Sequence, residues 1–112
     1  MLELRDTLRK FVAERDWDQF HSPKNLAMAL AVEAAELMEH FQWLTEAESR
    51  ALPPAKLEEL RDEMADVLVY LVRLADKLDV DLLDAAAKKI AKNALKYPAA
   101  KVRGSMKKYS DY

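Results

Sequence analysis

The sequence predicts an all-α chain, a bundle of four main helices that assembles as a helical oligomer. The 112 residues contain one glycine and four prolines, so few positions favour turns. Apolar residues recur every three or four positions over long stretches, which is the period of a helix. The length suggests one domain, residues 1–112, with a basic and less regular tail from about residue 97.

The first half of the chain predicts two helices and a connecting loop. An apolar stripe at helical spacing supports a helix from about Leu2 to about Trp17. Ser22 is a plausible N-cap, and Pro23 follows it at the first helical position. A second helix is therefore expected to start here and to reach about Trp43.

The second half predicts one short and two long helices. Thr45 and Glu48 fit a capping box, and Pro53-Pro54 would end the short helix that it starts. A third main helix is expected from about Ala55 to Leu78. The fourth covers about Asp81 to Lys96, with acidic residues near its start and lysines toward its end, as the helix dipole favours.

The second and third main helices are apolar nearly all round. This composition is typical of central helices or of helices at a subunit contact. Because a short chain cannot cover two such helices well, we expect a symmetric oligomer.

Two acidic pairs interrupt these apolar helices. Glu33 and Glu36 are the only charges between Leu26 and Met38, and Glu63 and Asp66 follow the same i, i+3 spacing in the next long helix. Each pair projects from one helix face, so the four carboxylates are expected to converge. Burying like charges is costly, and a hard divalent cation would offset that cost.

These four residues are therefore our predicted metal ligands, with Mg²⁺ as the expected ion and Mn²⁺ as an alternative. A di-iron site would need Glu-x-x-His pairs, which the sequence lacks. The other interpretation is structural: the carboxylates face solvent or form ion pairs with Arg61, Arg73 or lysines of the tail.

Charge is distributed unevenly along the chain. Residues 1–84 hold 10 basic and 19 acidic residues, whereas residues 85–112 hold 8 basic residues and one acidic residue. An acidic metal site facing a basic segment suits a small polyanion, although a solvated lysine face would look the same. Together with magnesium, it points to hydrolysis of a phosphoanhydride, and Glu36 is our choice for orienting or deprotonating the attacking water.

Aromatic residues lie near helix ends and near the acidic pairs. Trp17 and Trp43 could sandwich a nucleobase, and Tyr70 follows Asp66 by one turn. The alternative is that these rings belong to a core or an interface. His21 and His40 are interpreted as structural or exposed rather than as ligands.

Several function classes are disfavoured. The chain has no cysteine, which excludes disulfides and thiolate metal sites. It has no secretory signal and no apolar run near ~18 residues, so a cytoplasmic protein without membrane contact is expected. Nucleic-acid binding is not expected, because the charge is not globally basic and no groove-reading motif is present.

The order of motifs resembles the all-α MazG-like nucleotide pyrophosphohydrolases, and within them the dCTP pyrophosphatase branch. The family pattern ExxE…ExxD matches the two acidic pairs. WxxFHxPxNL matches Trp17 to Leu26, and Trp43 follows Glu36 by seven residues. The segment K-x-x-x-N-x-x-[RK]-Y-P matches Lys89, Asn93, Lys96 and Tyr97.

The resemblance implies magnesium-dependent hydrolysis of a nucleoside triphosphate to a monophosphate and pyrophosphate, with dCTP or modified dCTP as the first-ranked substrate. It implies that Trp17 and Trp43 line a base pocket with Tyr70 beside it, and that Lys89, Asn93, Lys96 and Tyr97 contact substrate. It also implies homodimers or homotetramers with sites near the subunit contact. In the animal branch a histidine stands nine residues before the first tryptophan, where this chain has Leu8, so base or sugar selectivity stays open.

Two alternatives remain at the level of the sequence. One is a non-catalytic helical dimerisation module, whose carboxylates would serve as salt-bridge partners. The other is a pyrophosphatase for another nucleotide, such as dUTP.

Overall fold

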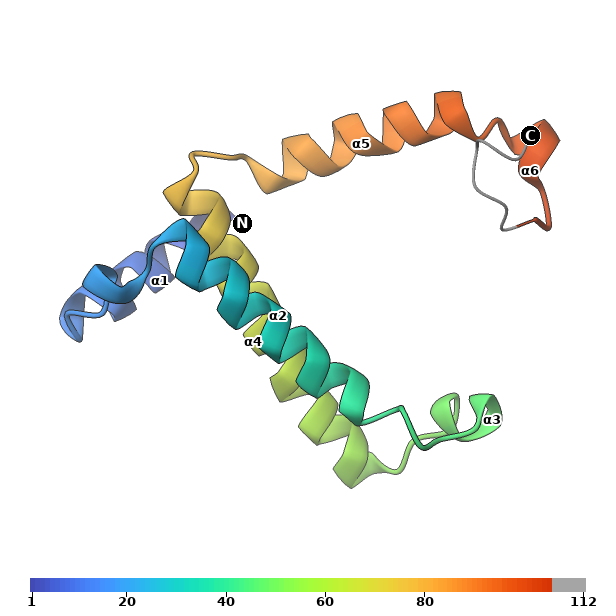
Figure 1. Ribbon diagram of the computed structural model, residues 1–112, viewed down its shortest axis with the longest axis horizontal. Helices are drawn as coiled ribbons and strands as arrows, with labels where there is room; N and C mark the ends of the chain where they lie inside the picture. The colour runs from blue at the N-terminus through green and yellow to red at the C-terminus, as the bar shows by residue number, and fades with distance from the viewer. Residues whose placement is uncertain (106–112) are drawn as a thin grey trace. The chain divides into compact units, whose positions relative to one another are not determined.

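The structure, a computed structural model, describes residues 1–105 and is all-helical, with no strand in that range. It divides into two compact units along the sequence, and the boundary between them follows Val80. The elements in chain order are α1 (Leu2–Glu14), η1 (Asp18–Phe20), α2 (Pro23–Glu39), α3 (Glu46–Ser49), α4 (Pro54–Lys77), α5 (Leu82–Lys96) and α6 (Ala99–Val102), coloured from blue to red in Figure 1. The prediction that residues 1–112 form a single domain stays a prediction.

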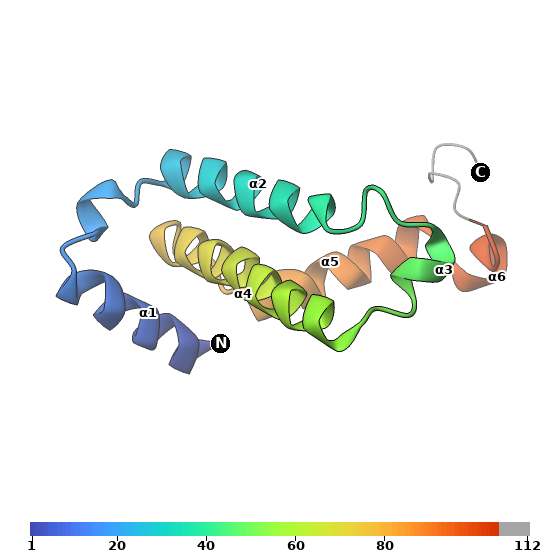
Figure 2. The ribbon, with the colours of Figure 1, turned by 90° about the horizontal axis from the view of Figure 1, so that it is seen from below.

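The first unit is organised around α2 and α4, which pack side by side and run in opposite directions (Figures 1 and 2). Helix α1 packs against α4 as well. Few apolar side chains are buried among the described residues, and they come from these three helices. They are Leu8, Val12, Leu26, Leu60, Val72 and Ala75.

Helix α1 ends at Glu14, three residues before the predicted end at Trp17. Asp16 adopts a left-handed conformation with φ of 53°, and the Trp17 amide donates to the Val12 carbonyl at 3.1 Å. This bond and the Asp16–Ala13 bond form a Schellman motif, which terminates a helix. Trp17 therefore lies in the turn that leads to α2.

Helix α2 begins as predicted. The Ser22 hydroxyl accepts from the Asn25 amide at 3.1 Å, and Pro23 is the first helical residue. The helix ends at Glu39 rather than at the predicted Trp43. After Glu39 the backbone forms i→i−3 bonds, including Phe41 to Met38 at 2.9 Å, so the chain turns away from the helix axis.

The predicted short helix is α3, and its capping box is present. The Thr45 hydroxyl accepts from the Glu48 amide at 3.1 Å, and the Glu48 carboxylate accepts from the Thr45 amide at 2.9 Å. Helix α4 then starts at Pro54 and ends at Lys77, within one residue of the prediction at each end. A second left-handed aspartate, Asp79, follows it.

The second unit contains α5 and α6. The Asp81 side chain caps α5 by accepting from the Asp84 amide at 3.1 Å, and the helix ends at Lys96 as predicted. The tail was predicted to be irregular, but Ala99–Val102 forms a helical turn after Pro98, which occupies its N-cap. Lys107 and Lys108 of the predicted basic segment lie outside the described residues.

Large apolar side chains remain exposed on several helices of the isolated chain. On α2 these include Met28 and Val32, exposed by 59% and 56%. On α5 they include Leu83, Ile90 and Leu95. Within residues 1–105, no helix combines the length and the apolar character needed to cross a bilayer.

Candidate metal centre and adjoining pocket

Three of the four predicted ligands meet between α2 and α4. Glu33 and Glu36 from α2 and Glu63 from α4 each offer a carboxylate oxygen, and these oxygens lie within 4.8 Å of one another. The antiparallel packing of the two helices brings residues some thirty positions apart in the sequence to the same level. Such an all-oxygen donor set suits a hard divalent cation.

Two carboxylate oxygens of these residues are buried and have no hydrogen-bond partner within residues 1–105. They are Oε2 of Glu33 and Oε1 of Glu63. The neighbouring carboxyl group of Glu63, which can share a proton with Glu33, raises the pKa of Glu33, and burial raises it further. Unpaired buried carboxylate oxygens are costly, so the cluster fits a cation as its missing partner.

The structural interpretation of the carboxylates finds no support in the ion pairs. Within residues 1–105, none of the four predicted ligands forms a salt bridge. Arg61 pairs with Glu58 at 2.8 Å, and Arg73 pairs with Asp18 at 3.0 Å. The two arginines that were considered as partners of the acidic pairs are thus engaged elsewhere.

Asp66 differs from the other three. It does not belong to the cluster whose oxygens converge within 4.8 Å, and it is exposed. Its negative charge nevertheless contributes to the raised pKa of Glu33, so it lies near the cluster. It also lines the pocket described next.

One face of α4 connects the acidic cluster with a pocket. Glu63, Asp66, Tyr70 and Arg73 follow one another at intervals of three, four and three residues, so they form a row along one side of the helix. The row starts in the cluster at Glu63, and its other three members line the pocket. The helix therefore places charged and aromatic groups in sequence along a single line.

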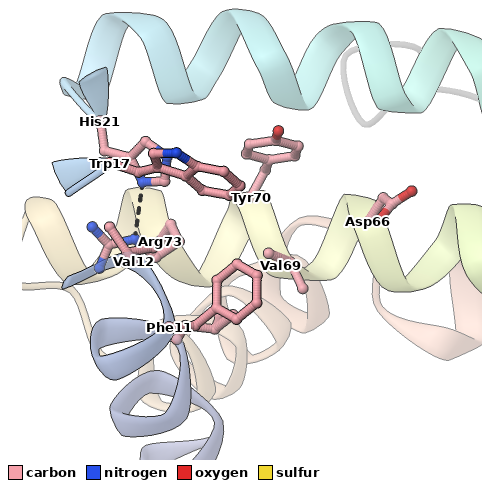
Figure 3. A pocket seen from close by; sticks show the side chains of 9 residues that line it. Phe11, Val12, Trp17, His21, Asp66, Val69, Tyr70 and Arg73 are labelled. Carbon is pink, nitrogen blue, oxygen red and sulfur yellow. Dashed lines mark hydrogen bonds between the residues drawn. The ribbon is translucent and has the colours of Figure 1, made fainter. Parts of the chain in front are cut away.

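The pocket has a volume of about 350 Å³ and lies between α1, the turn that follows it and α4 (Figure 3). This volume is within the range of ~300–1,000 Å³ that is usual for small-molecule sites. Aromatic rings and aliphatic side chains form most of its wall. The lining residues are Leu8, Phe11, Val12, Trp17, His21, Asp66, Val69, Tyr70 and Arg73.

The indole of Trp17 is held by a neighbouring residue of the pocket wall. Its ring contacts the Phe11 ring edge-to-face, with the centroids 5.8 Å apart, and the Arg15 guanidinium lies 3.7 Å from the Phe11 centroid. These contacts fix the part of the wall that Phe11 and Trp17 form. Trp17 and Tyr70, both predicted to bind the base, are therefore brought together as lining residues.

Trp43 is not part of this pocket. It lies beyond the C-terminal end of α2, whereas Trp17 precedes the N-terminal end of the same helix. A helix of 17 residues is about 25 Å long, so the two rings of one chain cannot enclose the same base. The Trp43 side chain is 87% exposed in the single chain.

The remaining predicted substrate contacts belong to the second unit. Lys89 and Asn93 lie on α5 at i, i+4 spacing and share a face, and both are exposed. Lys96 ends the helix, and the Tyr97 amide bonds to the Asn93 carbonyl at 2.8 Å. Their role in binding stays a prediction.

Among the polar residues of the pocket, sequence reasoning missed Arg73 and His21. Arg73 was considered only as an ion-pair partner for the acidic motifs, and His21 only as a structural or exposed side chain. The spacing of Arg73 from Tyr70 and Asp66 was a usable signal, because it continues the same helical row. The contact between Arg73 and His21 joins residues 52 positions apart and had no local signal.

Comparisons with known proteins show what this chain is similar to. The chain is 45% identical over 111 residues to dCTP pyrophosphatase 1 of Mus musculus and 43% identical to that of Homo sapiens. These matches cover 97% of this chain but only 65% of each relative's length. A solved pyrophosphatase from Archaeoglobus fulgidus superimposes with a TM-score of 0.83 at 41% identity, covering 88% of this chain and 92% of that one. Residues 28–112 match the MazG-like family, and the chain therefore belongs to that family.

Proposed function

We propose that this protein is a nucleoside triphosphate pyrophosphohydrolase that converts a deoxynucleoside triphosphate and water to the monophosphate and pyrophosphate. The observation that carries the proposal is the cluster of Glu33, Glu36 and Glu63 beside an aromatic pocket of about 350 Å³. The names of the relatives, dCTP pyrophosphatase 1 and a pyrophosphatase, support the same reaction class.

Magnesium is the cation that we propose for the cluster, with manganese as the alternative. Glu33, Glu36 and Glu63 would hold it, and Asp66 would complete the set from the same row of α4. When bound, the ion would neutralise phosphate oxygens and lower the pKa of an attacking water.

Glu36 is the residue that we propose to orient or deprotonate the water. It is exposed, whereas Glu33 and Glu63 are partly buried, so it has the best access to a water molecule on the substrate side. Attack on the α-phosphorus forms the new P–O bond, and pyrophosphate leaves as the α–β anhydride bond breaks. The water proton passes to the Glu36 carboxylate.

The base would lie in the pocket, next to the rings of Trp17 and Tyr70. Stacking on such rings is worth ~1–3 kcal/mol per base. We rank dCTP and modified dCTP first among substrates, as the relatives' names suggest. On α5, the pair Lys89 and Asn93, followed by Lys96 and Tyr97, would bind the phosphates.

Assembly belongs to the same proposal. The exposed apolar side chains of α2 and α5 would be covered in a homodimer or homotetramer. Because Trp43 cannot reach the pocket of its own chain, we propose that it lines the pocket of a second copy. A cytoplasmic location stays the prediction made from the sequence.

The decisive experiment is a triphosphate panel with product analysis in the presence of magnesium. Pyrophosphate and dCMP are the expected products from dCTP, and Glu36→Gln should lower kcat by at least about 100-fold, as loss of a general base does. Glu39→Gln, an exposed substitution on the same helix, is the matched control and should behave as wild type.

Three outcomes separate the alternatives. Equal turnover by wild type and Glu36→Gln would remove the assigned role of the acidic cluster. Preference for dUTP would keep the reaction and change the substrate. Absence of turnover on every triphosphate, in a protein that still assembles, would favour the dimerisation module.

A further inference from the structure

Arg73 is a buried cation that the proposed chemistry does not use. Its side chain is 3% exposed, and it is the one charged residue among the described part of the chain that is fully buried. Nη2 donates to Asp18 at 3.0 Å and Nη1 donates to Asp76 at 3.3 Å. Burying a guanidinium is costly unless it is paired, and the two carboxylates offset that cost.

The third contact of Arg73 is with His21. Nε of Arg73 donates to Nδ1 of His21 at 3.3 Å, the bond drawn as a dashed line in Figure 3. A guanidinium can only donate hydrogen bonds, so Nδ1 of His21 must accept. A neutral imidazole that accepts at Nδ1 carries its proton at Nε2.

The surroundings of His21 agree with this neutral tautomer. Burial lowers the pKa of His21, and the positive charge of Arg73 lowers it further. The ring lines the pocket, and no partner for its Nε2 is found within residues 1–105. The nitrogen that carries the proton is therefore the one left for a ligand.

We propose that Arg73 is a positioning residue for base recognition, which fixes His21 as the Nε2–H tautomer so that the pocket presents a hydrogen-bond donor to the base. The group recognised is an acceptor on the edge of a pyrimidine, a ring carbonyl oxygen or an unprotonated ring nitrogen. This inference rests on the proposed nucleotide site and adds a polar contact to the stacking rings.

Arg73 also fixes where that donor stands. It holds the Asp18 side chain at the start of η1 and the His21 ring just after its end, and Lys77 binds the same Asp18 oxygen at 2.6 Å. The turn that carries Trp17 is thereby attached to α4 at two points. Loss of Arg73 would change both the tautomer and the position of the donor, with no direct contact to the substrate.

The first test needs no variant and no activity. Long-range ¹⁵N–¹H correlation spectra of the full chain at neutral pH report which ring nitrogen of His21 is protonated, with His21→Gln used for assignment. The proposal requires Nε2–H in the wild type and a larger share of the Nδ1–H form in Arg73→Met. A protonated Nδ1 in the wild type would overturn it.

The second test measures recognition by steady-state kinetics. In Arg73→Met, KM for dCTP should rise about tenfold with kcat nearly unchanged, the size expected for one hydrogen bond. KM for 2-deoxyribose 5-triphosphate, which has no base, should not change. Arg61→Met, an exposed arginine on the same helix, is the matched control. Equal effects on both substrates would contradict a role in reading the base.

A pair of His21 variants keeps the test decisive if Arg73→Met does not fold. A glutamine amide can place an N–H near the position of Nε2, whereas the shorter asparagine cannot. His21→Gln should therefore keep most of the affinity for dCTP, and His21→Asn should lose about tenfold. Equal affinities would overturn the proposal.

The tautomer is measured without turnover, so a chain that hydrolyses no nucleotide would refute the proposed function while leaving the Arg73–His21 contact testable.

Discussion

At the scale of single residues, the feature that matters most is a local conflict. Oε2 of Glu33 and Oε1 of Glu63 are buried and have no hydrogen-bond partner among the described residues. A sequence optimised for stability alone would avoid this arrangement, and such conflicts are expected at functional sites. The conflict therefore gives a stability signature that is independent of turnover.

Glu33→Gln should stabilise the metal-free protein. The pKa of Glu33 is raised in the folded state, so folding favours the protonated carboxyl group. The resulting stabilisation is fully present below the ordinary pKa of 4.5 and is lost as the pH rises through the higher pKa of the folded state. At neutral pH the variant should gain about 1 kcal/mol over the wild type in EDTA, the low end of the penalty for an unsatisfied buried group. Urea unfolding between pH 4 and 8 measures the difference.

Added magnesium should make the wild type more stable than Glu33→Gln. Excess metal stabilises the wild type by mass action, whereas the variant lacks one ligand and should respond weakly. Glu39→Gln, outside the cluster, should respond as the wild type does. A Glu33→Gln protein with the full magnesium response would show that this carboxylate is not a ligand.

At the scale of elements, the turn between α1 and α2 positions one wall of the pocket. The Ser22 hydroxyl caps α2, and the Asn25 side chain donates to the Phe20 carbonyl at 3.1 Å. These bonds fix the segment between Trp17 and His21 against the start of a helix. Stability of the cap and geometry of the pocket are therefore coupled.

Ser22→Ala should cost about 1 kcal/mol, because the Asn25 amide loses its acceptor. Ser22→Asp keeps an acceptor at the cap and should stay close to the wild type. Urea unfolding gives the free energies, and KM for dCTP should rise in the alanine variant only. Equal stability of the two variants would show that the cap contributes little.

An ion pair joins a second pair of elements, α1 and α4. Arg9 of α1 donates through Nε to Asp76 of α4 at 2.7 Å, and this bond lowers the pKa of Asp76. A depressed carboxyl pKa stabilises the fold above the ordinary value of 3.8, and the contribution is lost as pH falls through the lower folded value. The contact should therefore weaken only in acid.

Asp76→Asn should destabilise the protein by on the order of 2 kcal/mol at pH 7. This is less than the cost of breaking a fully buried ion pair, because Asp18 still neutralises Arg73 in the variant. The difference from wild type should shrink below about pH 4, where the carboxyl group becomes protonated. Asp62→Asn, exposed on the same helix, is the control. A pH-independent difference would contradict the assigned ion pair.

At the scale of the whole molecule, the isolated chain leaves much apolar surface in contact with water. Met28 and Val32 are four residues apart on α2 and form an exposed stripe. Patches of this kind mark contacts with partners, and a second copy is the partner that we propose.

Val32→Lys should shift the assembly toward monomers, since a buried ammonium without a partner opposes association. Sedimentation velocity over a range of concentrations measures the shift, and an effect of at least tenfold on the dissociation constant is expected. Ala13→Lys adds the same charge at an exposed position of α1 and is the control. A wild type that stays monomeric at high concentration would contradict the proposed oligomer.

Shared sites predict complementation between two inactive variants. Trp43→Ala lacks the ring proposed to reach a second copy, and Glu36→Gln lacks the proposed base. If both act in one site but come from different chains, a refolded equimolar mixture of dimers should recover roughly a quarter of wild-type activity. Activity that stays at the level of the separate variants would place Trp43 outside the partner's pocket.

Local features predicted the main helices correctly, because caps and prolines act over a few residues. Ser22-Pro23, the Thr45–Glu48 capping box and Asp81 each start a helix as expected. The i, i+3 spacing of the acidic pairs was sufficient to bring Glu33, Glu36 and Glu63 together once α2 and α4 were antiparallel. The ends of α1 and α2 were placed too late, since a left-handed aspartate and i→i−3 bonds have weak sequence signals.

The sequence by itself thus determined the helices, the acidic motifs and the family to which they point. Only the tertiary structure decided how those side chains are distributed: Asp66 lines the pocket instead of joining the tight cluster, Trp43 stands at the far end of α2, and Arg73 binds His21. The physical reason is the distance along the sequence over which each interaction acts. Capping and helical periodicity depend on residues at most four positions apart, whereas the contact of Arg73 with His21 exists only after α4 has packed against the turn before α2.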